Sequence, residues 1–244
     1  MDKKIAFLGT PNFAVPILKS IHQSNYKISC VFSQPPRKSN RGHKLNKSPI
    51  HLLSEELGIE IKTPENIEKE IDFIKSLNLD LAIVVAYGQI LSKNILSLSK
   101  NGFINIHASL LPKWRGAAPI QRSLINMDKI TGLSIMKINS KLDEGPVCNK
   151  YPLDILENEN AKGLADRLSN LAAEKILTNI ENILQQKSNF EEQDSSMATY
   201  AKKIQKIEGK INWNNGADEI LAKINGLYPQ PGAWFSFDNN RHKI

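Results

Sequence analysis

Cysteine is scarce in this chain of 244 residues, which contains only Cys30 and Cys148. These two form neither a CxxC pair nor a disulfide framework, which excludes the class of small, disulfide-stabilised secreted domains. Long apolar runs are also missing, because none approaches the ~18 residues needed to cross a bilayer, and the N-terminus lacks a signal-peptide pattern. Together these absences predict a soluble protein of the reducing cytoplasm.

Two common signatures of bound metals and cofactors are missing as well. The five histidines are scattered, and no pair has the HxxxH spacing of a zinc site, so we expect no metal. The first apolar strand ends at Gly9, which Thr-Pro-Asn-Phe follows in place of the GxGxxG fingerprint. We therefore expect no nicotinamide cofactor.

The chain has fewer acidic than basic residues. The formal net charge is +7 and the pI is about 9.3. This balance favours an anionic partner such as nucleic acid or a phosphate-rich substrate, although a generally basic proteome would produce the same value. The length and the hydrophobic fraction of 41% allow one large α/β domain with a smaller part appended.

Alternating apolar segments predict an α/β fold: a Rossmann-like, mostly parallel sheet with helices on both faces. Residues 5–9 and 26–32 read as strands joined by a helix that Thr10 caps, which makes a βαβ unit. The wholly apolar strand 81–85 suits the middle of such a sheet. Further helices are expected at 48–58, 66–77, 117–126 and 160–186, and further strands at 59–61, 103–106, 131–138 and 147–153.

The chain is expected to comprise a catalytic domain at 1–187, a linker at 188–206 and an incomplete second domain at 207–244. The last part contains a helix at 215–227 and a hairpin whose strands flank Asp238-Asn-Asn. A two-stranded hairpin with no sheet to join is marginally stable. We therefore expect that the chain is truncated within a β-rich domain.

A basic insertion at 33–47 interrupts the α/β pattern and reads as a long irregular loop. Its candidate contacts with a phosphate backbone are the cations Arg37, Lys38, Arg41, Lys44 and Lys47. A solvated surface loop would have the same composition, so the sequence leaves both interpretations open.

Asn105, His107 and Asp143 are the candidate catalytic residues. Asn105 and His107 lie two residues apart at a strand end and therefore point to the same side. A carboxylate would orient the imidazole, and an amide could donate to an oxygen that gains negative charge during acyl transfer. A single histidine in a strand is more often structural, however, and Asp143 could simply form a turn.

A resemblance to a known family bears on these alternatives. Residues 105–121 read Asn-Ile-His-Ala-Ser-Leu-Leu-Pro-Lys-Trp-Arg-Gly-Ala-Ala-Pro-Ile-Gln and resemble the signature of the folate-dependent formyltransferases. Leu-Asp-Glu-Gly-Pro at 142–146 resembles the second motif of that family. Segments 7–14, 40–45 and 86–91 extend the similarity along the chain. They resemble the corresponding segments of the family members that act on initiator methionyl-tRNA.

The resemblance implies that Asn105, His107 and Asp143 are catalytic. It further implies that 10-formyltetrahydrofolate, as co-substrate, binds Ser109, Leu110, Leu111, Pro112, Tyr87, Gly88 and Leu91. The expected acceptor is the methionine amine of initiator tRNA, held by the basic insertion and by a truncated OB-like domain, in a monomeric cytoplasmic enzyme of translation initiation. Two alternatives are a formyltransferase with a small amine acceptor and a catalytically impaired tRNA-binding fragment.

Overall fold

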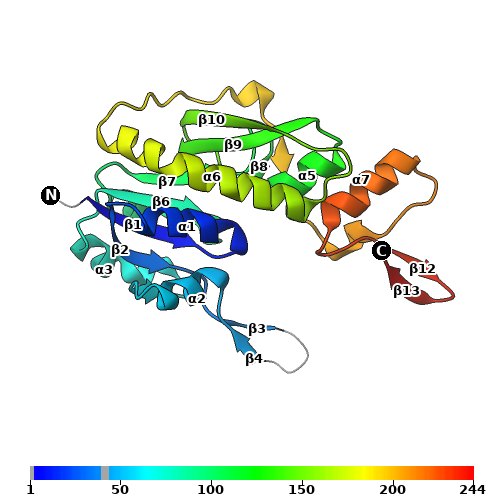
Figure 1. Ribbon diagram of the computed structural model, residues 1–244, viewed down its shortest axis with the longest axis horizontal. Coiled ribbons are helices and arrows are strands. Elements are labelled where there is room, and N and C mark those ends of the chain that lie inside the picture. Colours follow the sequence, from blue (N-terminus) through cyan, green and yellow to red (C-terminus); the bar gives the residue numbers. More distant parts are fainter. Residues whose placement is uncertain (1–2, 40–43) are drawn as a thin grey trace. The chain divides into compact units, whose positions relative to one another are not determined.

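The structure is a computed structural model that describes residues 3–39 and 44–244 (Figure 1). Arg41, one of the predicted tRNA contacts, lies outside the described residues, as do the side chains of Lys38 and Lys44. The chain divides into two compact units. The first comprises residues 1–107, 135–149 and 169–192, and the second comprises residues 108–134, 150–168 and 193–244.

The main sheet has seven strands in the order β10-β9-β7-β6-β1-β2-β5. Its central strands run parallel, with Ile5 opposite Leu81 and Val84 opposite Asn105. The fold is therefore the mostly parallel α/β class predicted from the sequence. The strands are β1 (Lys4–Gly9), β2 (Lys27–Phe32), β5 (Ile61–Lys62), β6 (Leu81–Val85), β7 (Phe103–His107), β9 (Ile130–Lys137) and β10 (Val147–Asp154).

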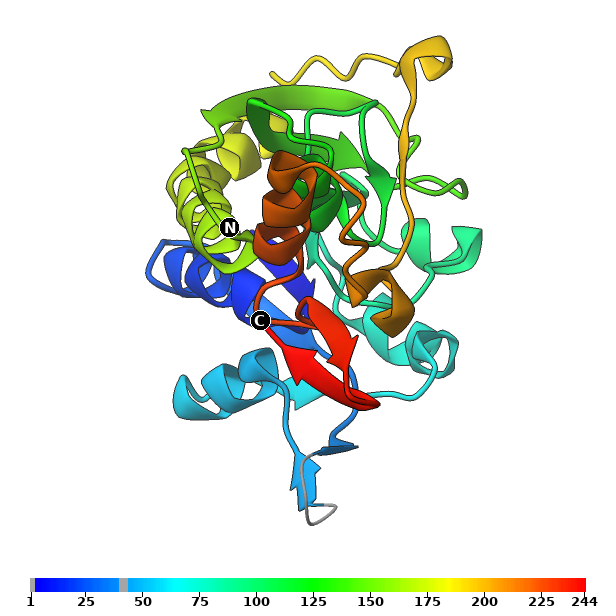
Figure 2. The same cartoon turned by 90° about the vertical axis from the view of Figure 1, so that its right-hand side faces the viewer.

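The basic insertion contains two short strands, so the expectation of a wholly irregular loop was wrong. Strands β3 (Arg37–Ser39) and β4 (Lys44–Asn46) pair antiparallel, with Arg37 opposite Asn46. We call these two strands the arm. Figures 1 and 2 show the arm extending away from the sheet of the first unit.

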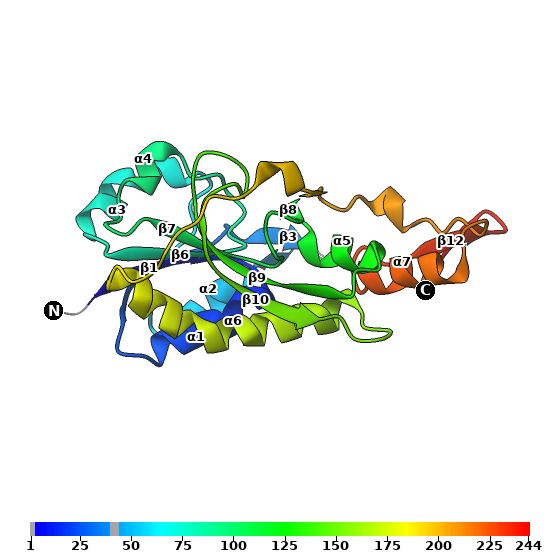
Figure 3. The same ribbon diagram turned by 90° about the horizontal axis from the view of Figure 1, so that it is seen from above.

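Helices cover both faces of the sheet in the first unit. Figure 3 shows α1 and α6 on one face and α3 and α4 on the other. On the α3 side, Ala6, Leu8 and Phe103 belong to one buried apolar cluster, and Ile5 and Phe7 are also buried. A strand covered on both faces must be apolar throughout, which explains why β1 shows no alternation. The helices are α1 (Val15–His22), α2 (Pro49–Glu56), α3 (Ile71–Ser76), α4 (Lys93–Leu96) and α6 (Ala161–Leu184).

Two helix starts differ from the expectation. Pro11 rather than Thr10 is the N-cap of a short 3-10 helix, η1 (Asn12–Ala14), because the Thr10 hydroxyl donates to the carbonyl of Tyr87 instead. The segment expected as one helix at 66–77 begins as a 3-10 helix, η2 (Ile67–Glu70), and continues as α3.

The second unit contains α5 (Pro119–Ile125) packed against α7 (Ala217–Leu227). Gly226 permits this approach, since a Cβ there would lie 2.6 Å from Cγ1 of Ile125. The expected terminal hairpin is present as β12 (Trp234–Phe237) and β13 (Asn240–Lys243). The other elements of this unit are β8 (Arg115–Gly116), β11 (Tyr200–Ala201), η3 (Ser195–Met197) and η4 (Lys206–Gly209). Nowhere in 3–39 or 44–244 is a helix both long and apolar enough to span a bilayer.

Candidate active site

Asn105 and His107 are two of the last three residues of β7, a strand inside the sheet. The alternation of a strand places both side chains on one face. The side chain of His107 is only 6% exposed, whereas Asn105 is partly exposed. Among the described residues no hydrogen bond occupies the amide of Asn105, so this amide can donate to a ligand.

Two backbone hydrogen bonds fix the ends of the loop that carries Asp143. The N–H of Ile138 donates to the carbonyl of Phe103 at 2.8 Å, and the N–H of Lys137 donates to the carbonyl of Pro146 at 2.9 Å. Gly145 is needed here, because a Cβ at this position would collide with the carbonyl oxygen of Lys137. The first bond attaches the start of the loop to Phe103, the first residue of β7, and the second joins the two ends of the loop.

His107 and Asp143 are neighbours as a result. Nδ1 of His107 lies 3.8 Å from Oδ2 of Asp143, and the carboxylate is 18% exposed. This distance exceeds that of a hydrogen bond, so the interaction in this state is electrostatic. The structure thus brings together His107 and Asp143, with Asn105 on the same face of the strand.

The turn after β6 lies at the same edge of the sheet as the end of β7. Tyr87 and Leu91, two predicted folate contacts, are 2% and 5% exposed and belong to the apolar cluster. Burial also raises the pKa of the Tyr87 hydroxyl above its ordinary value. Gly88 is exposed, and Ile90 is 93% exposed. The turn therefore offers the backbone at Gly88 and the side chain of Ile90 to a ligand, while Tyr87 and Leu91 pack behind it.

Two hydrogen bonds to the carbonyl of Tyr87 help to hold this turn, and neither was expected from the sequence. The carbonyl of Tyr87 accepts from the Thr10 hydroxyl at 2.9 Å and from the Gln34 side-chain amide at 3.2 Å. Ala86 adopts a φ of 48° and Gly88 a φ of 88°. A residue with a side chain rarely adopts the left-handed conformation, so these contacts maintain a turn that Ala86 would otherwise leave.

The tetrapeptide 109–112 is fixed within the second unit by Ser134, a buried residue of β9. The Ser134 hydroxyl donates to the carbonyl of Ser109 at 2.7 Å and accepts from the N–H of Leu111 at 2.9 Å. The Ser109 hydroxyl donates to the carbonyl of Lys113, so it serves the loop itself. Ser109 and Leu111 are buried, which leaves Leu110 and Pro112 as the partly exposed members.

The predicted tRNA contacts of the basic insertion differ in their surroundings. Arg37 is exposed, and its guanidinium donates to the side-chain oxygen of Gln34 at 3.0 Å. Lys47 already has a partner, because its ammonium lies 2.6 Å from a carboxylate oxygen of Glu55. The hydrogen bond from Lys47 lowers the pKa of Glu55. Arg37 is therefore more available than Lys47 to a phosphate.

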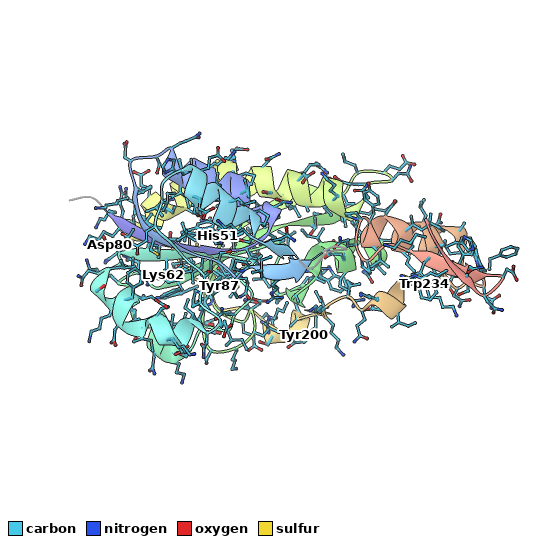
Figure 4. All side chains as sticks on the ribbon, turned by 90° about the horizontal axis from the view of Figure 1, so that it is seen from below. His51, Lys62, Asp80, Tyr87, Tyr200 and Trp234 are labelled. Atoms are coloured by element: carbon cyan, nitrogen blue, oxygen red, sulfur yellow. The ribbon has the colours of Figure 1, made fainter. Side chains whose placement is uncertain are left out.

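A basic cavity of about 670 Å³ lies within the second unit. Lys203, Lys206, Arg241 and Lys243 line it, and no acidic side chain does. Among the described residues none of these four cations forms an ion pair. The guanidinium of Arg241 lies 4.2 Å from the ring centroid of Trp234, on the hairpin (Figure 4). The candidate phosphate contacts named from the sequence include none of these four cations, which come from two separate segments of the chain.

The two cysteine thiols are not activated as nucleophiles. Burial raises the pKa of Cys30 to about 12 and that of Cys148 to about 11, so neither is a thiolate at neutral pH. In the part of the chain that the structure describes, no three His, Cys, Asp or Glu side chains form a group that could hold a metal ion. The candidate chemistry therefore rests on the amide, the imidazole and the carboxylate.

Comparisons with known proteins identify relatives of this chain. The family profile described as "Formyl transferase" matches residues 3–180, and the profile "Formyl transferase, C-terminal domain" matches residues 203–244. The N-formyltransferase of Helicobacter canadensis, solved with folinic acid and dTDP-3-aminofucose, is similar in fold with a TM-score of 0.76 and 20% identity. That alignment covers 98% of this chain and 85% of the other.

Curated relatives are closer in sequence. A protein of Pelagibacter ubique named "Methionyl-tRNA formyltransferase" is 58% identical over 100% of this chain and 80% of its own length. A protein of the same name from Phenylobacterium zucineum is 42% identical over 99% of this chain and 79% of its own length. The profile matches, these identities and the shared fold lead to one conclusion: this chain belongs to the formyl transferase family.

Proposed function

We propose that the chain transfers a formyl group from 10-formyltetrahydrofolate to the α-amine of methionine on initiator tRNA, giving the N-formylmethionyl-tRNA that initiates translation. The observation that carries this proposal is the pairing of His107 with Asp143 beside Asn105. The choice of acceptor is supported by the relatives named methionyl-tRNA formyltransferase, which match along the whole chain. Because charged tRNA and reduced folate are cytoplasmic, we propose the same compartment for the chain, which we take to act as a monomer.

The catalytic roles follow from the chemistry of the three side chains. The folate supplies the formyl group, whose oxygen gains negative charge as the amine attacks the carbon. Asn105 and protonated His107 donate to that oxygen, as in other oxyanion sites. Asp143 holds the imidazolium and accepts the proton of the attacking amine through water, and this proton returns to the departing folate nitrogen.

The folate site is proposed at the turn 86–91 and at Ser109, Leu110, Leu111 and Pro112. A flat apolar ring suits the surface that Ile90 leaves open, because an exposed large apolar side chain gains free energy when a ligand covers it. Gly88 lets the ring approach the backbone. The buried side chains of Tyr87 and Leu91 contribute by packing against the turn from behind.

The tRNA site is proposed on two basic features. One comprises Arg37, Lys38, Arg41, Lys44 and Lys47, of which Arg37 is the described side chain most open to a phosphate. The other is the cavity of the second unit, where four cations without ion pairs among the described residues favour an anion. The proposed division into a catalytic domain at 1–187, a linker at 188–206 and a tRNA-binding domain at 207–244 is supported by the two family profiles.

The test is a comparison of acceptors with one formyl donor. The chain is incubated with 10-formyltetrahydrofolate and either initiator methionyl-tRNA or an amino sugar nucleotide, and labelled product is counted. We expect transfer to methionyl-tRNA that increases with enzyme concentration, and none to the sugar. Transfer to the sugar alone would identify a small-amine enzyme, and tRNA binding without transfer would identify an impaired fragment; either result contradicts the proposal.

A further inference from the structure

One side chain, Gln34, joins the arm to the turn at the end of β6. Its amide nitrogen donates to the carbonyl of Tyr87 at 3.2 Å, and its amide oxygen accepts from Nη2 of Arg37 at 3.0 Å. Its backbone N–H also approaches the Thr10 hydroxyl at 3.4 Å. All four residues lie in the first unit, so the chain of contacts is internal to one compact body.

The two contacts require a side-chain amide. A carbonyl needs a donor and a guanidinium needs an acceptor, and the glutamine amide presents one of each. A glutamate could accept from Arg37 but could not donate to Tyr87 when ionised. A lysine or arginine could donate to Tyr87 but would repel Arg37. The polarity of the two partners also fixes the orientation of the amide.

Gln34 contacts the turn at a conformationally demanding place. A Cβ on Gly88 would lie 3.6 Å from the amide nitrogen of Gln34, so the side chain lies along the turn as well as bonding to it. Ala86 and Gly88 both have positive φ. A turn of this kind depends on its contacts, because the isolated residues do not favour it. The position of Gln34 therefore affects how well the turn is preformed.

At its other end Gln34 contacts the first residue of the arm. Arg37 begins β3, and it is exposed. When a phosphate draws the guanidinium into one position, it also fixes the Gln34 oxygen that the guanidinium contacts. A ligand that orders one part of such a linked pair lowers the ordering cost of the other part.

From these contacts we propose that Gln34 is a positioning residue that couples tRNA binding at the arm to folate binding at the turn 86–91. The inference rests on the proposed function. Coupling between two sites is reciprocal, so tRNA raises the affinity for folate by the same factor as folate raises the affinity for tRNA. The hydrogen bonds involved are partly exposed, and we expect a factor of about three to ten.

The experiment measures the dissociation constant of 5-formyltetrahydrofolate with and without saturating initiator tRNA, by calorimetry on the whole chain. Gln34→Ala removes both contacts, Gln34→Glu removes the donor to Tyr87 and keeps the acceptor for Arg37, and Arg37→Ala removes only the link to the arm. Gln23→Ala is the matched control, because Gln23 is an exposed glutamine of the same unit with no side-chain hydrogen bond to the described residues.

The expected pattern separates the two halves of the link. In the unchanged chain and in Gln23→Ala, tRNA raises the affinity for folate by the coupling factor. Gln34→Ala and Gln34→Glu bind folate about three- to tenfold more weakly without tRNA and show no coupling. Arg37→Ala loses coupling while it keeps folate affinity in the absence of tRNA. Loss of fold stability alone would shift the melting temperature without this pattern.

Two results overturn the coupling. The first is that tRNA does not change the folate dissociation constant of the unchanged chain. The second is that tRNA raises the folate affinity of Gln34→Ala or Arg37→Ala as much as that of the unchanged chain. Formylation of methionyl-tRNA by the unchanged chain is measured in parallel. Normal formylation with either of these results overturns the coupling alone, whereas absent formylation overturns the proposed function and the coupling with it.

Discussion

Nδ1 of His107 lies 3.8 Å from Oδ2 of Asp143, although the two residues come from different segments of the chain. The carboxylate places a negative charge beside the imidazole, and it is partly open to water. Asp143→Asn removes that charge while it keeps the size of the side chain. Asparagine also tolerates the φ of 50° at this position. We expect single-turnover formylation to fall by about 100- to 10,000-fold.

The control for this variant is Asp72→Asn, an exposed aspartate in the first turn of α3. Its activity should match that of the unchanged chain. Thermal unfolding should be similar for both variants, because Asp143 is not part of the buried core. Near-normal turnover in Asp143→Asn would remove this residue from the proposed mechanism.

Asn105→Ala tests the other side of the site. The variant loses an amide that the described residues leave without a hydrogen bond, so folding should be retained. Removal of one oxyanion donor typically lowers turnover by a factor of about 100 to 1,000. The measurement is single-turnover transfer to methionyl-tRNA, with circular dichroism as the check on folding. A variant that is folded and fully active would show that Asn105 does not contact the reacting oxygen.

Gly145→Ala should displace the loop that carries Asp143. A Cβ at residue 145 would collide with the carbonyl oxygen of Lys137, and backbone on both sides must move. A misplacement of about 1 Å at a catalytic group can cost about 100-fold in rate, which is the loss we expect in turnover. Gly216→Ala is the control, because nothing lies within 4 Å of the added Cβ. Equal activities in the two variants would contradict this account of the loop.

The sheet and most helices could be predicted from the sequence because burial constrains them strongly. A run such as Leu81–Val85 is apolar at every position and has no place except between two covered faces. The arm could not be predicted in this way. Its strands are short and cationic, and they lack the apolar alternation that marks a half-buried strand.

The candidate site was predictable in part. Asn105 and His107 follow from the period of a strand. Asp143 was expected to follow a parallel neighbour of β7, whereas the contacts of Ile138 with Phe103 and of Ser134 with Ser109 show that β9 runs opposite to β7. The hydrogen bonds of Gln34 to Tyr87 and of Ser134 to Leu111 could not be predicted from the sequence. They join residues 53 and 23 positions apart, and they depend on the exact path of the backbone. Nor did the sequence show that Ile90 is exposed while its neighbour Leu91 is buried.

Ser134→Ala tests the support of the tetrapeptide 109–112. The change leaves the N–H of Leu111 buried without a partner, which costs about 1–3 kcal/mol in the free energy of unfolding. Because the tetrapeptide is a proposed folate contact, the KM for folate should rise more than kcat falls. Ser123→Ala is the control, since that hydroxyl is buried in the same unit but bonds only within α5. If both variants had the same KM, Ser134 would serve stability alone.

The stability of the second unit should fall in acid because of Glu208. Its carboxylate receives two hydrogen bonds from Arg122, at 2.7 and 3.2 Å, and these chiefly lower its pKa below the ordinary 4.5, against the opposing effect of burial. The ionised form therefore favours the folded state. Its contribution to the free energy of unfolding is complete above pH 4.5 and is lost as the pH falls from there through the lower pKa of the folded chain. Urea unfolding measured between neutral and acidic pH should show a free energy of unfolding that falls less steeply in acid for Glu208→Gln than for the unchanged chain.

Glu157→Gln is the control, at an exposed glutamate with no ion pair among the described residues. Its free energy of unfolding should fall in acid as steeply as that of the unchanged chain. Equal acid dependence in both variants would show that the pair of Glu208 with Arg122 does not control it.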